Sequence, residues 1–463
     1  MGTTVKKHEI DMLHGSIWNK LPLFALPVAA TAILEQLFHA SDVAIVGNFT
    51  GDARTVAVAA VGANGPIIGL IVNLFIGIAL GANVVIANAI GCRDDNAVKR
   101  AVHTAIVFAV CGGAAVALLG QLIASPLLSI LNVPEDVFPY ALLYLRIYLL
   151  GMPVILLYNF EAAIFRSIGD TKVPLAALAV SGVLNVLLNL FFVIVLHMTV
   201  NGVAIATVAA NAVSAALLYV RLTRTDKCVR VERKALRIDG ASLKRILSIG
   251  LPAGVQSAVF SFANIVIQSA INSFGSVVMA GSSAASGIEN FIHTALNTFY
   301  QSAITFTGQS IGASDPRRAV RVFRINLALT TGLGIVLCAL AQIFQAPLLG
   351  LYVQSTDPAY DAVIAAGVVR VLALSRFQWV GGLMETACGT LRGLGHSMNP
   401  TVTTLIGACL LRVVWRYTVF EAVGTVESMY WSYPVSWLLT FLIHLIYLER
   451  DRRRLMVENT AAR

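Results

Sequence analysis

Charged side chains are scarce in this sequence. Only 12% of its 463 residues are Asp, Glu, Lys or Arg, and 57% are hydrophobic, whereas a soluble domain usually carries about 25% charged residues. Apolar runs of about 20 residues or more, long enough to cross a bilayer core, recur along the whole chain. We count twelve such runs, with neither a large polar domain nor a β-barrel alternation between them. The sequence therefore predicts an all-α integral membrane protein with twelve transmembrane helices.

Cysteine and catalytic motifs are also sparse. The 6 cysteines are scattered and none forms a C-x-x-C pair, so we expect neither a disulfide framework nor a zinc site. The sequence contains no H-E-x-x-H and no phosphate-binding P-loop. We therefore expect no enzyme, no organic cofactor and no use of ATP.

The basic residues are unevenly placed, although the formal net charge is only +9. With twelve spans, almost all Lys and Arg fall on the side that holds both termini, and Arg54 falls on the other side. The exceptions lie within spans: Arg146, Arg370, Arg376, Arg412 and Arg416. By the positive-inside rule, we expect a multi-pass protein of the inner (plasma) membrane with both termini in the cytoplasm. Nucleic-acid binding is not expected, because no folded domain could carry it.

The chain repeats itself at an offset of about 220 to 226 residues. FALPVAATAILEQLFHASDVAIVGNF resembles SIGLPAGVQSAVFSFANIVIQSAINSFG, ANAIGCRDDNAVKR resembles GQSIGASDPRRAVR, and the segment around Glu161 resembles that around Glu385. We infer two six-helix lobes of like orientation, related by a pseudo-two-fold axis along the membrane normal. The predicted parts are an N-terminal cytoplasmic tail 1–19, an N-lobe 20–222, a cytoplasmic linker 223–245, a C-lobe 246–448 and a C-terminal cytoplasmic tail 449–463.

One hydrophobic segment of the N-lobe carries an unusual polar stripe. Glu35, His39 and Asp42 are spaced by four and then three residues, which places them on one face of a helix. An acid at the centre of a membrane helix costs roughly 2.5–3.5 kcal/mol on insertion scales. The repeat does not reproduce these residues, since Phe260, Asn264 and Ile267 stand at the matching positions. A polar site specific to the N-lobe is therefore predicted.

Several motifs together resemble the multidrug and toxic compound extrusion (MATE) family. They are Pro27 followed by Asp42-x4-Gly47, then Phe165-Arg166-Ser-Ile-Gly169-Asp170-Thr171-Lys172-x-Pro174, then Gly308-Gln309-Ser-Ile-Gly312-Ala313. The resemblance covers residues 15–448. It implies a secondary antiporter that exports cationic, amphipathic organic compounds in exchange for protons or sodium ions by alternating access.

The resemblance also implies an ion site in the N-lobe. Family members that handle ions there use an acid on span one, an Asn on span four, an Asn and an Asp on span five, and a Thr on span six. The matching residues are Asp42, Asn159, Asn185, Asn189 and Thr207. Asn189 departs from the family, which often has a second Asp there. A single acid favours a proton over sodium as the coupling ion, because hard cations prefer charged oxygens; sodium at the Asp42 cluster remains the alternative.

Other polar residues in the spans are assigned by position. We expect Glu35, Gln36, His39 and Glu289 to contact the cationic substrate, with a structural role as the alternative for each. An acid on span seven, used by another branch of the family, is replaced by Phe260. We expect architectural roles for the charges that recur in both halves, which are Arg146, Glu161, Arg370 and Glu385. Asn185 and Asn189 could instead serve as hydrogen-bonding contacts between helices.

Two other functions remain open at this point. A flippase for lipid-linked saccharides would share the architecture but would need a cationic cavity. The arginines within spans are the only sequence feature that supports such a cavity. A channel or a membrane receptor is the third class. We expect a monomer whose partners are small organic cations, the coupling ion and membrane lipids.

Overall fold

The computed structural model describes residues 10–51, 54–131, 133–353 and 358–461. Within these ranges the chain is almost entirely helical and contains no strand. Residues 1–9 and 462–463 of the two predicted tails lie outside the described residues.

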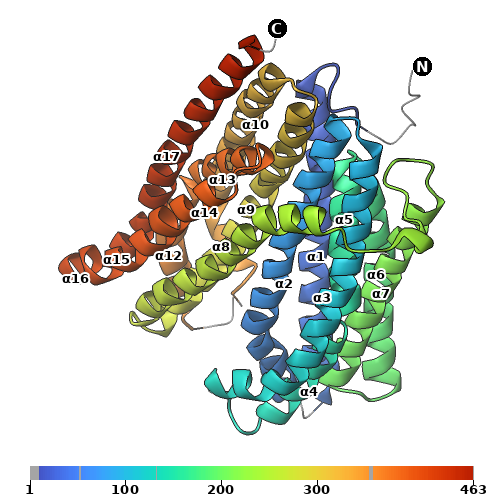
Figure 1. The fold of residues 1–463 in the computed structure, drawn as a ribbon. Coiled ribbons are helices and arrows are strands. Elements are labelled where there is room, and N and C mark those ends of the chain that lie inside the picture. The colour runs from blue at the N-terminus through green and yellow to red at the C-terminus, as the bar shows by residue number, and fades with distance from the viewer. Residues whose placement is uncertain (1–9, 52–53, 132, 354–357, 462–463) are drawn as a thin grey trace. The chain divides into compact units, whose positions relative to one another are not determined.

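The first half of the chain forms seven α-helices, shown in blue to green in Figure 1. They are α1 (Ile17–Phe49), α2 (Arg54–Gly91), α3 (Asp95–Ile130), α4 (Phe138–Leu150), α5 (Met152–Ser167), α6 (Lys172–Leu190), which continues into a π-helical turn at Phe191–Val195, and α7 (Val200–Arg224).

The second half repeats this order with more interruptions, in yellow-green to red in Figure 1. Its α-helices are α8 (Gly240–Asn272), α9 (Ser276–Gly312), α10 (Pro316–Ile343), α11 (Gln345–Gly350), α12 (Tyr360–Arg370), α13 (Gln378–Gly393), α14 (Met398–Thr404), α15 (Leu411–Tyr417), α16 (Val419–Val423) and α17 (Val426–Ala461).

The long apolar helices correspond to membrane spans. In the described ranges, nine helical segments are long and apolar enough to cross a bilayer, and two bent pairs, α4 with α5 and α12 with α13, each form one further span. The bends are 51° and 42°. The first bend falls at Gly151, just before Pro153, a residue that cannot donate a backbone hydrogen bond to the preceding turn. The remaining long helix is α9, with 37 residues.

The chain divides into two compact units that are not contiguous halves. Unit 1 comprises Met1–Ile10 and Ala30–Gly254, and unit 2 comprises Asp11–Ala29 and Val255–Arg463. Two of the three changes of unit fall within three residues of Pro27 in α1 and of Pro252 in α8, and the third lies between Ile10 and Asp11. The predicted lobes 20–222 and 246–448 therefore differ from these units by the first segments of α1 and α8. The predicted linker is also shorter in the structure, because α7 ends at Arg224 and α8 begins at Gly240.

Glycines join the first segment of α8 to α2 inside unit 1. A Cβ atom on Gly77 would lie 2.3 Å from the backbone nitrogen of Gly254, and one on Gly81 would lie 2.3 Å from the carbonyl oxygen of Ile246. Gly250 meets the backbone of α2 in the same way. Each helix thus presents a G-x-x-x-G pair, which allows two membrane helices to pack backbone against backbone.

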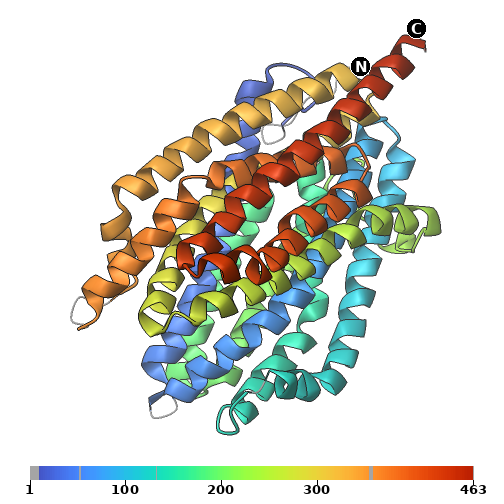
Figure 2. The ribbon, with the colours of Figure 1, turned by 90° about the vertical axis from the view of Figure 1, so that its left-hand side faces the viewer.

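The last helix extends well beyond the predicted C-lobe. α17 runs without a break to Ala461, so most of the predicted tail 449–463 is helical (Figures 1 and 2). His396, in the turn after α13, donates from Nδ1 to Asp451 Oδ2 at 2.8 Å and ties this extension to unit 2. The hydrogen bond and the negative charge of Asp451 raise the pKa of His396, although burial and nearby Arg454 act in the opposite direction.

Candidate functional site

Asp42 is the centre of a buried polar cluster in unit 1. It lies on α1, fifteen residues after Pro27, and only 3% of it is exposed. Its Oδ1 atom accepts a hydrogen bond of 2.6 Å from the Asn189 side-chain amide on α6. Its Oδ2 atom accepts one of 3.2 Å from the Thr207 hydroxyl on α7. Three helices therefore meet at this carboxylate.

Asn185 closes the cluster into a ring. Its amide oxygen accepts from Asn189 Nδ2 at 3.3 Å, and its own Nδ2 donates to Thr207 Oγ1 at 3.4 Å. Asn185 and Asn189 are one turn apart on α6, so the same helix face presents both amides. The structure brings together four of the five residues predicted for the ion site.

Neutral groups make all of these hydrogen bonds. Among the described residues, no Lys, Arg or His forms an ion pair with Asp42. An ionised carboxylate in such a site keeps its full negative charge, which is costly in a low-dielectric surrounding. A bound proton or a monovalent cation would remove this charge. The cluster therefore has the chemistry of a site for one positive charge.

The orientation of Asn189 bears on which cation fits. Its amide N–H faces Asp42, and its oxygen is buried without a hydrogen-bond partner in the described part of the chain. A metal ion bound by Asp42 would need the amide oxygen, not the N–H group, on that side. A proton adds to the carboxylate without a coordination shell, so it demands less rearrangement. No group of three or more His, Cys, Asp or Glu side chains that could hold a metal ion occurs in the described residues.

The cluster opens into a small cavity of about 130 Å³ in unit 1. Glu35 and His39, both predicted from the helical stripe, line it together with Asp42, and Gln36 does not. Ligand pockets for drug-sized molecules usually measure about 300–1,000 Å³. In this conformation the cavity therefore has room for an ion and water rather than for a large organic substrate.

Asn159 occupies a more peripheral position than expected. It lines the cavity, but its amide nitrogen donates to the Ile155 carbonyl oxygen of its own helix at 2.9 Å. Tyr148 and Tyr158 also line the cavity and are largely buried. Neither tyrosine was predicted from the sequence. Their position on the fourth span, on either side of the bend at Gly151, is the signal that could have identified them.

A glycine fixes the approach of α1 to α6. Gly182 lies one turn before Asn185 and faces the ring of Phe38, which lies one turn before Asp42. A Cβ atom on Gly182 would lie only 1.7 Å from Phe38 Cζ. The close approach of these two turns brings Asp42 within hydrogen-bonding distance of the α6 amides. The sequence shows Gly182 only as one of 36 glycines.

Glu289 belongs to a different cluster, inside unit 2. Both of its carboxylate oxygens accept from the Arg370 guanidinium, at 3.0 and 2.8 Å. Arg370 also donates to the Ser282 hydroxyl at 2.6 Å, and Gln378 donates to the Glu289 carbonyl oxygen at 2.7 Å. The predicted substrate contact of Glu289 would therefore have to compete with a buried bidentate ion pair.

The charges that recur in both halves have unlike surroundings. Glu385 accepts from His293 at 2.8 Å and from Asn297 at 3.1 Å. Glu161 is fully buried, and neither of its oxygens has a hydrogen-bond partner among the residues described. Likewise Arg370 is buried and paired, whereas Arg146 is exposed. Recurrence in the repeat therefore does not imply a common environment.

Helices that cross a membrane, arranged around a buried polar cavity, define a membrane transporter. The sequence profile of the MatE family matches residues 27–191 and 252–418. The chain belongs to this family of transporters, as its motifs predicted, and it is not an enzyme.

Individual relatives agree with this assignment. The "Probable multidrug resistance protein YoeA" of Bacillus subtilis is 26% identical over 443 residues, which is 92% of each chain. The "FAD transporter" of Shewanella oneidensis is 25% identical over 316 residues, 67% of this chain and 69% of its own. A structure described as "Crystal structure of MATE in the bent conformation" has a TM-score of 0.89, covers 97% of this chain and 98% of its own, and is 17% identical. The predicted fold, twelve membrane helices in two six-helix lobes, is confirmed.

Proposed function

We propose that this chain is a proton-driven exporter of cationic, amphipathic organic compounds. The observation that carries the proposal is the buried carboxylate of Asp42, which among the described residues accepts hydrogen bonds only from neutral donors and faces a cavity that Glu35 also lines. Two acids in one cavity attract a cation, and protonation of Asp42 would remove part of that attraction. Competition between proton and substrate for the same charge is the basis of antiport.

A one-for-one exchange of a proton for a singly charged organic cation moves no net charge, so the pH gradient and not the membrane potential drives it. Each unit of pH difference supplies about 1.4 kcal/mol, which corresponds to a roughly tenfold concentration ratio. We place both termini in the cytoplasm and the protein in the inner membrane, so that protons enter as substrate leaves.

The name of YoeA, a probable multidrug resistance protein, supports a drug-like substrate. The name of the Shewanella oneidensis relative, "FAD transporter", suggests an anionic substrate as the alternative. The cavity of unit 1 is lined by Glu35 and Asp42, with no Lys or Arg among its lining residues. In a conformation wide enough to admit substrate, this lining would repel FAD and also the phosphate groups of a lipid-linked saccharide. A cationic substrate is therefore the better fit.

Efflux from reconstituted vesicles tests the proposal. Purified protein is placed in vesicles loaded with a fluorescent organic cation, and proton and sodium gradients are imposed independently. We expect efflux with a proton gradient alone and none from Asp42→Asn, a variant of equal size that cannot bind the proton. Asn48→Ala, on the same helix, is the matched control, because Asn48 is exposed and bonds only its own helix. Efflux that requires sodium, or wild-type efflux from Asp42→Asn, would overturn the proposal.

A further inference from the structure

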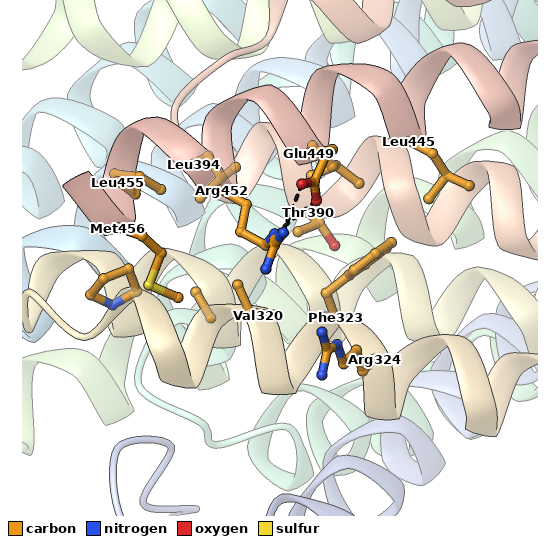
Figure 3. Close-up of a pocket in the computed structure, with 13 residues that line it drawn as sticks. Val320, Phe323, Arg324, Thr390, Leu394, Leu445, Glu449, Arg452, Leu455 and Met456 are labelled. Carbon is orange, nitrogen blue, oxygen red and sulfur yellow. Dashed lines mark hydrogen bonds and ion pairs between the residues drawn. The ribbon is translucent and has the colours of Figure 1, made fainter. Parts of the chain in front are cut away.

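Unit 2 contains an open groove at one end of its helices (Figure 3). Its volume is about 320 Å³, and its walls come from the first turns of α10, the end of α13 and the last turns of α17. The lining is largely apolar and includes Val320, Phe323, Leu445, Leu455 and Met456. Arg324 on α10 and the pair Glu449 and Arg452 on α17 add charge.

The repeat shows how the matching face is treated in unit 1. Asp94 and Asp315 cap the starts of α3 and α10 in the same way, each accepting from the backbone N–H three residues later. In this alignment of the two repeats, His103 of α3 occupies the position that Arg324 occupies in α10. His103 is buried because the linker covers it: the backbone N–H of Glu232 donates to His103 Nε2 at 3.0 Å.

The linker closes this face with apolar side chains as well. Val229 and Val231 are buried almost completely, and the backbone N–H of Asp239 donates to the Thr104 hydroxyl at 2.9 Å. In unit 2 Phe323 packs against a cluster that includes Leu448 of α17, but it is only partly buried, and Arg324 is exposed. A face that unit 1 covers with its linker is thus only partly covered in unit 2.

The groove lies where apolar helix gives way to basic helix. Arg317, Arg321 and Arg324 occupy the first turns of α10, and an apolar stretch begins at Ile325. On α17 the apolar stretch ends at Leu448, and a run of arginines follows. This boundary corresponds to the headgroup region of a bilayer, where arginines contact lipid phosphates.

The charges in the groove leave one arginine available. Arg452 donates twice to Glu449, at 2.7 and 2.7 Å, and Arg453 donates to it at 3.0 Å. Glu449 is thereby neutralised. Arg324 forms no hydrogen bond or ion pair that involves the described residues, so its guanidinium can bind a phosphate in a bidentate manner.

We propose that an anionic phospholipid occupies this groove. Its phosphate binds Arg324, and one acyl chain lies against Val320, Phe323 and the apolar face of α17. The apolar walls explain why a lipid fits better than a free anion, and the excess of arginine disfavours a cationic substrate. The lipid then takes the place in unit 2 that the linker takes in unit 1.

Lipid titration of the purified full chain tests this proposal. The protein in a neutral detergent is titrated with phosphatidylglycerol, phosphatidylcholine or soluble glycerol phosphate, and the thermal unfolding midpoint gives an apparent Kd. We expect saturable stabilisation by phosphatidylglycerol alone. Arg324→Gln should weaken it about tenfold. Arg321→Gln, one turn away and outside the groove, is the matched control and should change it by less than about twofold.

A second variant tests the position of the acyl chain. Val320→Trp fills the groove without changing its charge and should abolish the stabilisation, and its elution on size exclusion reports whether it is folded. Equal weakening by Arg324→Gln and Arg321→Gln would show general electrostatic attraction and overturn the proposal. Equal stabilisation by glycerol phosphate or phosphatidylcholine would also overturn it, as would undiminished lipid binding by a folded Val320→Trp protein.

Discussion

Replacement of Gly182 by alanine should disable the Asp42 cluster without touching any polar group. The new Cβ would lie 1.7 Å from Phe38 Cζ, whereas carbon atoms normally approach to about 3.5–4.0 Å. The ring, or α1 with it, must therefore move by about 2 Å. The hydrogen bond between Asn189 and Asp42 is 2.6 Å long, and a displacement of α1 by about 1 Å or more would break it.

The size of the effect follows from these two changes. Overpacking of this kind costs about 1–3 kcal/mol of stability, and loss of a hydrogen bond to a charged group costs about 1.5–3 kcal/mol. We expect proton-driven efflux to fall about tenfold or more and to require a steeper pH gradient. The assay is vesicle efflux at graded external pH, with thermal stability measured in parallel.

Two further variants make this reasoning refutable. Gly65→Ala on α2 is the matched control, because a Cβ there meets no atom within 4 Å. Phe38→Ala combined with Gly182→Ala should recover activity relative to Gly182→Ala alone, since the clash is removed. Wild-type efflux and ion dependence in Gly182→Ala would show that the approach of α1 to α6 does not position Asp42.

Three other predictions concern single groups. Asn185→Leu and Asn189→Leu should each raise the pH gradient needed for half-maximal efflux. The effect of Asn189→Leu should be larger, because the Asn189 amide donates to Asp42 at 2.6 Å; unchanged ion dependence would reduce both to packing contacts. Glu289→Gln should lower the free energy of unfolding by about 3–5 kcal/mol, because it leaves Arg370 buried without a charged partner. Full stability with impaired transport would instead favour the substrate contact predicted from sequence. The raised pKa of His396 stabilises the fold below the unfolded pKa of about 6.5, and this stabilisation is lost as the pH rises through the folded pKa. His396→Gln should therefore lower stability by up to about 1 kcal/mol near pH 6 and have no effect near pH 9; equal losses at both pH values would exclude the charge as the cause.

The polar cluster was accessible from sequence because its members are chemically conspicuous. An acid and two amides in apolar helices stand out, and the comparison of the two halves showed that Asp42 has no counterpart. Helical spacing then fixed which face each residue occupies. The roles of these residues in transport remain predictions.

Other parts of the arrangement depend on contacts that spacing does not encode. Glu289 and Arg370 are 81 residues apart, and nothing in either segment indicates their pairing. The repeat predicted similar roles for Glu161 and Glu385, but partners on neighbouring helices decide the environment of each. The need for a glycine at position 182 comes from the ring of Phe38, which is distant in sequence. Such features require the helices to be packed before they can be recognised.

The exchange of helix ends between the two units limits how this protein can be divided. A cut within residues 225–239 separates the two repeats in sequence, yet the first half would keep Asp11–Ala29, which packs with unit 2, and would lose the start of α8, which packs with unit 1. Neither product would contain all the segments of one unit. The glycine contacts of Gly77 and Gly81 would also lose their partner helix. We therefore expect each half to depend on the other for folding, so that cleavage at the linker does not yield two independent folding units.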